Sequence, residues 1–132
     1  MKNGKVFEVV VGRTVKLTVE DIDDIMVSCL EGGVTSCWCS EAEVVEDRRC
    51  ADWGHEQIAR GGALVLHDIE DDSEKWELDL ERFLNGFKLW VEQGLDEYGA
   101  VQKDGTVDCG EIDAACADEI VQLALFGEVQ FA

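Results

Sequence analysis

The sequence of 132 residues contains no proline, two histidines, one tyrosine and only 11 lysines and arginines. No apolar run approaches the roughly 20 residues that a membrane-spanning helix needs. The N-terminal residues, MKNGKVFEVVVG, lack the long apolar region of a signal peptide. Neither a low-complexity linker nor an internal repeat divides the chain. These absences predict a single domain over residues 1–132 in a cytoplasmic protein.

Few residues are suited to catalysis. A nucleophile needs a neighbouring base, and the chain has only His55 and His67 to serve as imidazole bases. His67 and Asp68 are adjacent in a predicted strand, so their side chains point to opposite faces. The pairs Gly32-Gly33 and Gly61-Gly62 follow predicted helices, which is typical of helix ends and not of phosphate-binding loops. We therefore predict a protein that is not an enzyme and that has no cofactor.

Acidic residues are what the chain has in excess. Thirty aspartates and glutamates give a formal net charge of −19. Residues 1–66 hold 12 acids and 7 bases, whereas residues 67–132 hold 18 acids and 4 bases. A field of this sign repels nucleic acid and anionic membranes and attracts basic protein surfaces. The alternative interpretation is that the acidity serves solubility alone.

Hydrophobic periodicity predicts an α+β fold, with a small, mainly antiparallel sheet packed against three to four helices. The predicted strands are a hairpin over 5–18 that turns at Gly12-Arg13, a strand within 34–45, paired strands over 63–68 and 75–80, and a short last strand over 127–131. The predicted helices cover 20–30, with Thr18 as N-cap, a short segment within 52–62, then 80–92 and 111–126.

Apolar residues at helical spacing identify the expected core. Gly86 interrupts the apolar stripe of the 80–92 helix, which indicates close packing at that point. The residues predicted to be buried are Ile22, Ile25, Met26, Phe83, Phe87, Trp90, Ile112, Ile120 and Leu123.

The stretch AVQKDGTVDCGEID, residues 100–113, resembles half of a calcium-binding EF-hand loop. With Asp104 at position 5, Gly105 and Glu111 fall at positions 6 and 12, as that loop requires. Positions 1 and 3 are Ala100 and Gln102, however, so two carboxylates are missing. We interpret the stretch instead as a turn at Asp104-Gly105, followed by Asp108 as N-cap and Glu111 as its capping-box partner.

Cysteines and histidine supply one set of candidate metal ligands. Cys37, Cys39, Cys50 and His55 are of the right type for zinc, although C-x-C lacks the two-residue gap of a zinc knuckle. Strand alternation would place Cys37 and Cys39 on one face and Trp38 on the other. Cys29 and Cys116 lie on apolar helix faces, where free cysteine packs as a small hydrophobe. The prediction is that no metal is bound, and a structural zinc module is kept as an alternative.

The densest acidic segment is the predicted loop between the paired strands. Its carboxylates are the first candidates for binding a basic surface of a host protein, with no direct contact to nucleic acid or membrane. The candidate partner-binding residues are Asp68, Glu70, Asp71, Asp72 and Glu74. A second hypothesis is a small-molecule or nucleotide-signal binder (a sponge), for which Arg48, Arg49 and Arg60, with Trp38 and Trp53, are the candidates.

Three segments carry a family resemblance: LTVEDIDDIMVSCLEGG, EQIARGGALVLHD and DCGEIDAACADEIVQLALFGEVQF. Together they resemble small acidic proteins of unassigned function from prophages and mobile elements of Gram-positive gut bacteria. The resemblance covers about half of the chain and includes no catalytic motif. It implies a phage-type accessory protein in the bacterial host cell, where inhibition of host defence is a common role. With the charge, it leads to the hypothesis of a nucleic-acid mimic that inhibits a CRISPR nuclease or a restriction enzyme.

Overall fold

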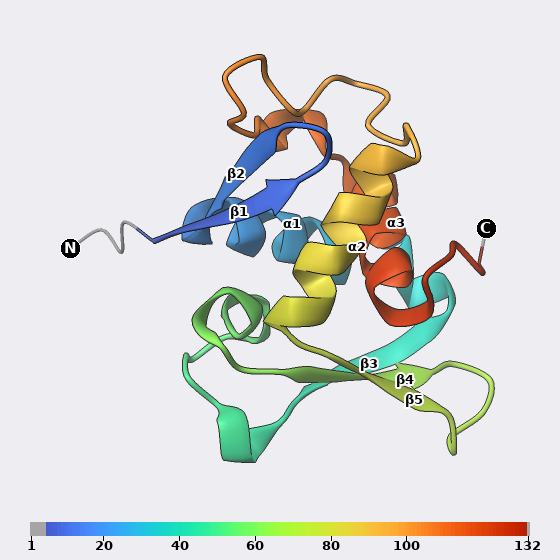
Figure 1. The fold of residues 1–132 in the computed structure, drawn as a ribbon. Helices are drawn as coiled ribbons and strands as arrows, with labels where there is room; N and C mark the ends of the chain where they lie inside the picture. Colours follow the sequence, from blue (N-terminus) through green and yellow to red (C-terminus); the bar gives the residue numbers. More distant parts are fainter. Residues whose placement is uncertain (1–4, 132) are drawn as a thin grey trace.

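A computed structural model describes residues 5–131 and confirms the α+β class. Met1–Gly4 and Ala132, at the ends of the predicted domain, lie outside the described residues. The strands form two antiparallel sheets instead of one: the hairpin of β1 (Val6–Val10) and β2 (Thr14–Thr18), and a three-stranded sheet in the order β3-β4-β5. Figure 1 shows these two sheets with the helices α1, α2 and α3 between them.

The three-stranded sheet consists of β3 (Cys39–Val44), β4 (Leu64–Asp68) and β5 (Lys75–Leu78). Both predicted pairings, the 5–18 hairpin and the 63–68 with 75–80 pair, are confirmed by the registers Val9↔Val15 and Leu66↔Trp76. Strand β3 starts later than predicted because residues 35–37 form a 3-10 turn. Cys37 is therefore exposed while Trp38 and Cys39 are buried, so the predicted alternation of these three residues is wrong.

Each α-helix starts at a side-chain cap. Helix α1 (Val19–Glu31) begins with a capping box in which Thr18 Oγ1 accepts from the Asp21 amide and the Asp21 carboxylate accepts from the Thr18 amide. Helix α2 (Leu80–Glu92) has the predicted bounds and is capped by Asp79. Helix α3 (Ala114–Phe126) is capped by Asp113 and ends at Gly127 in the left-handed region, with φ of 75°.

The predicted start of the last helix at residue 111 is wrong. Asp108 accepts a hydrogen bond from the Gly110 amide, but it caps a separate 3-10 helix, Cys109–Glu111. Ile112 then adopts an extended conformation and is buried, so the chain must restart its helix at Asp113. The predicted turn at Asp104-Gly105 is confirmed by the Val101↔Val107 bridge and the Gly105 N–Gln102 O bond.

Two other short elements also differ from prediction. Residues 52–62 form two 3-10 helices, Gly54–Glu56 and Ile58–Arg60, instead of one helix. The buried Gln57 lies between them, and its side chain bonds the backbone of Ala51 and Trp53. Residues 127–131 form no strand, because the amides of Gln130 and Phe131 donate to the Gln122 side chain and not to another strand.

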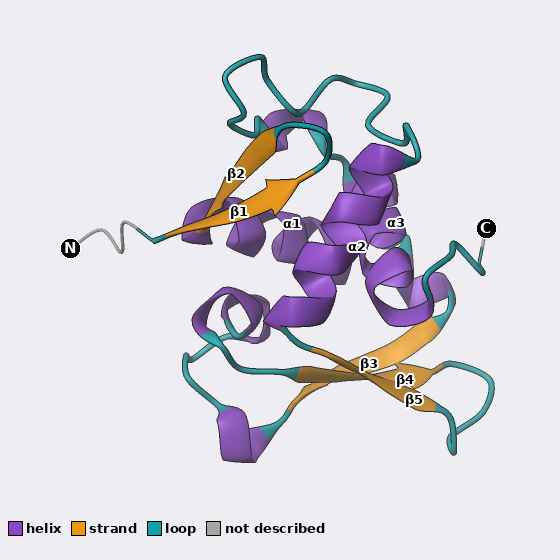
Figure 2. Ribbon diagram, in the orientation of Figure 1, coloured by secondary structure: helices purple, strands orange, loops and turns teal. Residues whose placement is uncertain are grey.

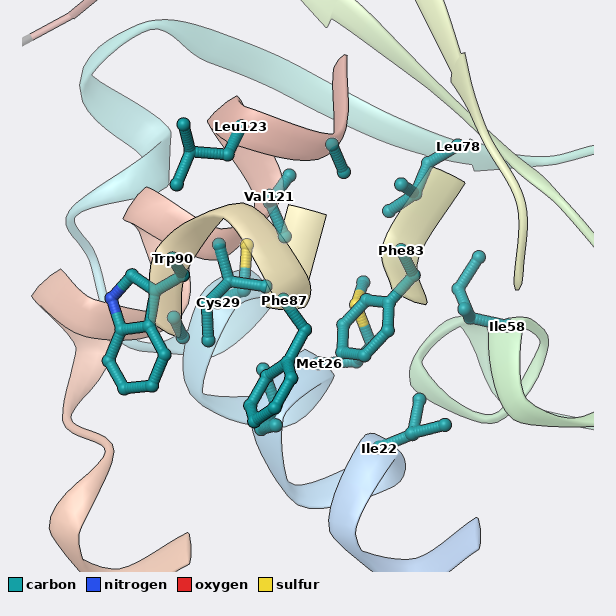
Figure 3. Packing of buried hydrophobic residues seen from close by; sticks show 14 of the residues in the cluster. Ile22, Met26, Cys29, Ile58, Leu78, Phe83, Phe87, Trp90, Val121 and Leu123 are labelled. Carbon is teal, nitrogen blue, oxygen red and sulfur yellow. The ribbon is translucent and has the colours of Figure 1, made fainter. Parts of the chain in front are cut away.

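The core lies where the three helices, purple in Figure 2, meet. Figure 3 shows the packing of its buried side chains. All nine residues predicted to be buried are buried. Helices α2 and α3 approach closely at Gly86, where an added Cβ would lie 2.6 Å from the Ile120 carbonyl oxygen and 2.6 Å from the Ala124 amide nitrogen. The close packing predicted at Gly86 is thus confirmed.

Candidate functional site

The acidic loop, residues 68–74, joins β4 to β5 and extends beyond the end of the sheet in Figure 1. Glu70, Asp71, Asp72 and Glu74 are exposed, whereas Asp68, the last residue of β4, is half-buried. Two carboxylates shape the loop: Asp68 Oδ1 accepts from the Glu70 amide at 2.8 Å, and Asp71 Oδ1 accepts from the Ser73 amide and hydroxyl. The Ser73 hydrogen bonds lower the pKa of Asp71. The loop therefore presents its carboxylates from a hydrogen-bonded turn.

An aromatic cluster adjoins this loop. The Trp38 ring stacks on Phe131, with centroids 5.2 Å apart, and contacts Trp76 and Phe126 at 5.9 Å each. The Ile69 amide donates to the Trp38 carbonyl oxygen at 2.9 Å, which ties the loop to the cluster. The Ile69 side chain is itself exposed. The acidic loop and the aromatic cluster are thus joined directly through the backbone.

A buried polar network contacts the aromatic cluster through the Trp38 indole. Asp118 of α3 accepts hydrogen bonds from the Thr35 hydroxyl (2.6 Å), the Trp38 indole N–H (2.8 Å) and the Gln122 amide (2.7 Å). The Gln122 Oε1 in turn accepts from the amides of Gln130 and Phe131. The network therefore fixes the Thr35 turn, Trp38 and the C-terminal segment relative to α3.

Sequence reasoning missed this network. Asp118 and Gln122 are four residues apart, so they share one face of α3, and both are flanked by apolar residues. Two polar residues at that spacing in a helix that is apolar nearly all round are the signal that indicates a buried pair. The aromatic residues give no such signal, because their contacts join three distant parts of the chain, around residues 38, 76 and 126–131.

Much of the acidity has a structural role at turns and helix starts. Eight of the aspartates accept hydrogen bonds from backbone amides, which suits a carboxylate near the positive end of a helix or turn. These residues are Asp21, Asp68, Asp71, Asp79, Asp96, Asp104, Asp108 and Asp113. Glutamates, which rarely cap, account for much of the remaining surface charge.

The arginines proposed for a nucleotide site are already bonded to protein groups. Arg48 pairs with Glu77, Arg49 with Glu46, and Arg60 with Asp23 through two hydrogen bonds. Trp53 is largely exposed, whereas Trp38 is buried in the aromatic cluster. The structure does not unite these side chains in a basic pocket.

The candidate zinc ligands are also not brought together. Within residues 5–131, no group of three or more His, Cys, Asp or Glu side chains could hold a metal ion. Cys39 is buried and Cys37 is exposed, while the Cys50 thiol lies 3.6 Å from the Gln57 side chain and backbone oxygens. Of the two histidines, His67 contacts Glu43 at 2.9 Å.

Comparison of the chain with protein-family models, curated proteins and solved structures finds no match in any of the three. In the part of the chain that the structure describes, no helix combines the length and apolar character needed to cross a bilayer. The site must therefore be interpreted from its own geometry.

Cysteine reactivity gives a direct test of this arrangement. Burial raises the pKa of both Cys29 and Cys116 to about 12, and burial together with Asp21 raises the pKa of Cys109 further. At pH 8 these thiols hold almost no thiolate, the reactive form. We expect DTNB to modify the exposed Cys37 and Cys50 quickly and the remaining thiols only after denaturation. Fast modification of Cys29 or Cys116, identified by peptide mass spectrometry, would contradict the described packing.

Proposed function

We propose that this protein is a non-enzymatic binding protein whose acidic surface occupies a basic, nucleic-acid-binding surface of a host protein. The resemblance to prophage-type proteins favours a host defence protein as the partner, such as a CRISPR nuclease or a restriction enzyme. The binding would be competitive: carboxylates take the positions of phosphates and engage the lysines and arginines that normally contact them.

The observation that carries this proposal is the acidic loop. It places four exposed carboxylates within five residues, Glu70 to Glu74, on a turn held by hydrogen bonds from within the loop. Because the turn is already ordered, binding costs less conformational entropy than it would for a flexible acidic tail. The overall charge of −19 adds a long-range attraction that guides a basic partner towards the protein.

No single carboxylate is expected to dominate. An exposed ion pair contributes only about 0.2–1 kcal/mol, so the loop must act as a group. A five-acid variant, Asp68→Asn, Glu70→Gln, Asp71→Asn, Asp72→Asn and Glu74→Gln, removes that group. Asparagine keeps the acceptor oxygens that Asp68 and Asp71 use in the turn, so the loop should keep its shape.

The test is affinity capture from bacterial lysate, with the native protein and the five-acid variant as parallel baits. We expect native bait to capture a nucleic-acid-binding protein that is released by raised salt and by added duplex DNA, and the variant to capture much less of it. A partner held equally by both baits and indifferent to salt and DNA would contradict the proposal.

A further inference from the structure

The Asp118 carboxylate is buried without a cation. Its residue is only 4% exposed, and its hydrogen-bond donors, Thr35, Trp38 and Gln122, are all neutral. Within residues 5–131, no lysine, arginine or histidine forms an ion pair with it. Burying a charge without an opposite charge beside it is energetically unfavourable.

The surrounding bonds use Asp118 as an acceptor only. Gln122 Oε1 is occupied by the amides of Gln130 and Phe131, so its Nε2 must be the group that faces Asp118. Asp118 then acts as acceptor at both oxygens, with two bonds to Oδ1 and one to Oδ2. An ionised carboxylate has about four acceptor positions, which leaves one unfilled on Oδ2. The charge and this position are not used by the internal network.

A cavity of about 300 Å³ opens beside this carboxylate. Its lining is apolar, aromatic and neutral except for Asp118 itself: Val34, Cys37, Trp38, Asp118, Gln130 and Phe131. The volume is at the lower end for ligand pockets, and suits one side chain better than a nucleotide. Two other hollows, near residues 43–47 and 102–106, contain no buried charged side chain.

We propose that this cavity, the Asp118 pocket, binds the guanidinium group of an arginine side chain from the basic partner. A guanidinium supplies the charge that Asp118 lacks and donors for its free acceptor position. It is also less strongly hydrated than an ammonium and stacks on aromatic rings, which favours arginine over lysine beside Trp38 and Phe131. Which partner protein carries this arginine depends on the proposed function. The binding of a guanidinium group in the pocket does not depend on it.

The pocket and the acidic loop would act on one partner surface. The Ile69 amide donates to the Trp38 carbonyl oxygen, so one hydrogen bond joins the acidic loop to a residue that lines the pocket. One inserted arginine would fix the register of the complex, while the loop carboxylates contact basic residues around it. This arrangement combines one buried charged contact with a rim of exposed ones, which favours specificity.

The test is an NMR titration of the native protein with Nα-acetylarginine methylamide, at 0.15 M salt to screen exposed carboxylates. The Trp38 indole N–H, assigned with Trp38→Phe, reports on the pocket because it is bonded to Asp118. We expect a saturable shift of this signal with the arginine probe, a smaller one with the lysine analogue, and none with the neutral citrulline analogue. An unchanged Trp38 signal, or equal shifts with arginine and citrulline, would overturn the pocket assignment.

Two variants measure how much the Asp118 carboxylate contributes to binding of the arginine probe. Asp118→Asn should weaken binding of the arginine probe about tenfold or more, since it removes a charged acceptor. Glu92→Gln, which removes one exposed charge at the end of α2, is the matched control and should bind like the native protein. Equal affinity of a folded Asp118→Asn variant would contradict the proposal. If that variant does not fold, the three probes on the native protein decide.

Failure of this inference can be separated from failure of the proposed function. Salt-sensitive capture of a basic partner, together with no response to the arginine probe, would contradict the pocket and leave the acidic-surface function standing. A response to the probe without any salt-sensitive partner would support the pocket and contradict the proposed function.

Discussion

Replacing Phe87 with alanine is expected to lower the free energy of unfolding by about 3–5 kcal/mol, the range for removing a large aromatic side chain from a core. Phe87 is fully buried in α2 and contacts Trp90, with ring centroids 5.7 Å apart. The neighbouring helices can only partly close the cavity that the substitution leaves. Denaturant titration followed by circular dichroism measures the loss.

Val10→Ala is the control for this experiment. Val10 is 61% exposed at the end of β1, and substitution there should change stability by no more than about 0.5 kcal/mol. Loss of less than about 1 kcal/mol in Phe87→Ala would mean that its side chain is not enclosed by the helices, and would contradict the described core.

The second large effect is expected from adding a single methyl group at Gly86. A Cβ there would lie 2.7 Å from the Ala124 Cβ, in addition to its close approach to the α3 backbone. Alanine is the better helix former by about 1 kcal/mol, but the two helices would have to separate. Overpacking of this kind costs about 1–3 kcal/mol or more. We expect Gly86→Ala to be destabilising overall, measured by the same titration.

Asn85→Ala provides the matched comparison. Asn85 is exposed on the same helix, so alanine there should be neutral or slightly stabilising through its helix propensity. If Gly86→Ala were as stable as Asn85→Ala, the close contact between α2 and α3 would be wrong.

The sequence predicted those parts of the fold that depend on local physics. Helix α2 has the predicted bounds because its Asp79 cap and its apolar stripe agree. The start of α3 was misplaced because Asp108 and Asp113 are both competent caps, and only the burial of Ile112 decides between them. Local sequence patterns predict that a helix forms. They do not predict which of two possible N-cap residues starts it when tertiary packing decides between them.

The site was predictable only in part for the same reason. The acidic loop could be identified, since its charge and its place between two strands are local properties. The Asp118 pocket could not be identified, because Thr35 and Trp38 reach Asp118 from a distant part of the chain. The strand predicted over 127–131 does not form, because the amides of Gln130 and Phe131 donate to the Gln122 side chain, a contact that no local pattern indicates.

The association rate with the captured partner distinguishes binding through the acidic loop from attraction by net charge alone. The five-acid variant should be compared with a control in which Glu8, Glu20, Glu92, Glu97 and Glu111, all exposed and outside the acidic loop, are changed to glutamine. Both variants lose the same net charge, so a difference between them reports on the loop itself. Stopped-flow or surface-binding kinetics at several salt concentrations give both rate constants.

If the acidic loop forms the interface, the association rate of the five-acid variant should fall about tenfold or more at low salt, and much further than that of the control. Its dissociation rate should change less, and the difference between the variants should shrink as salt rises. Equal association rates for the two variants, or rates independent of salt, would contradict the account.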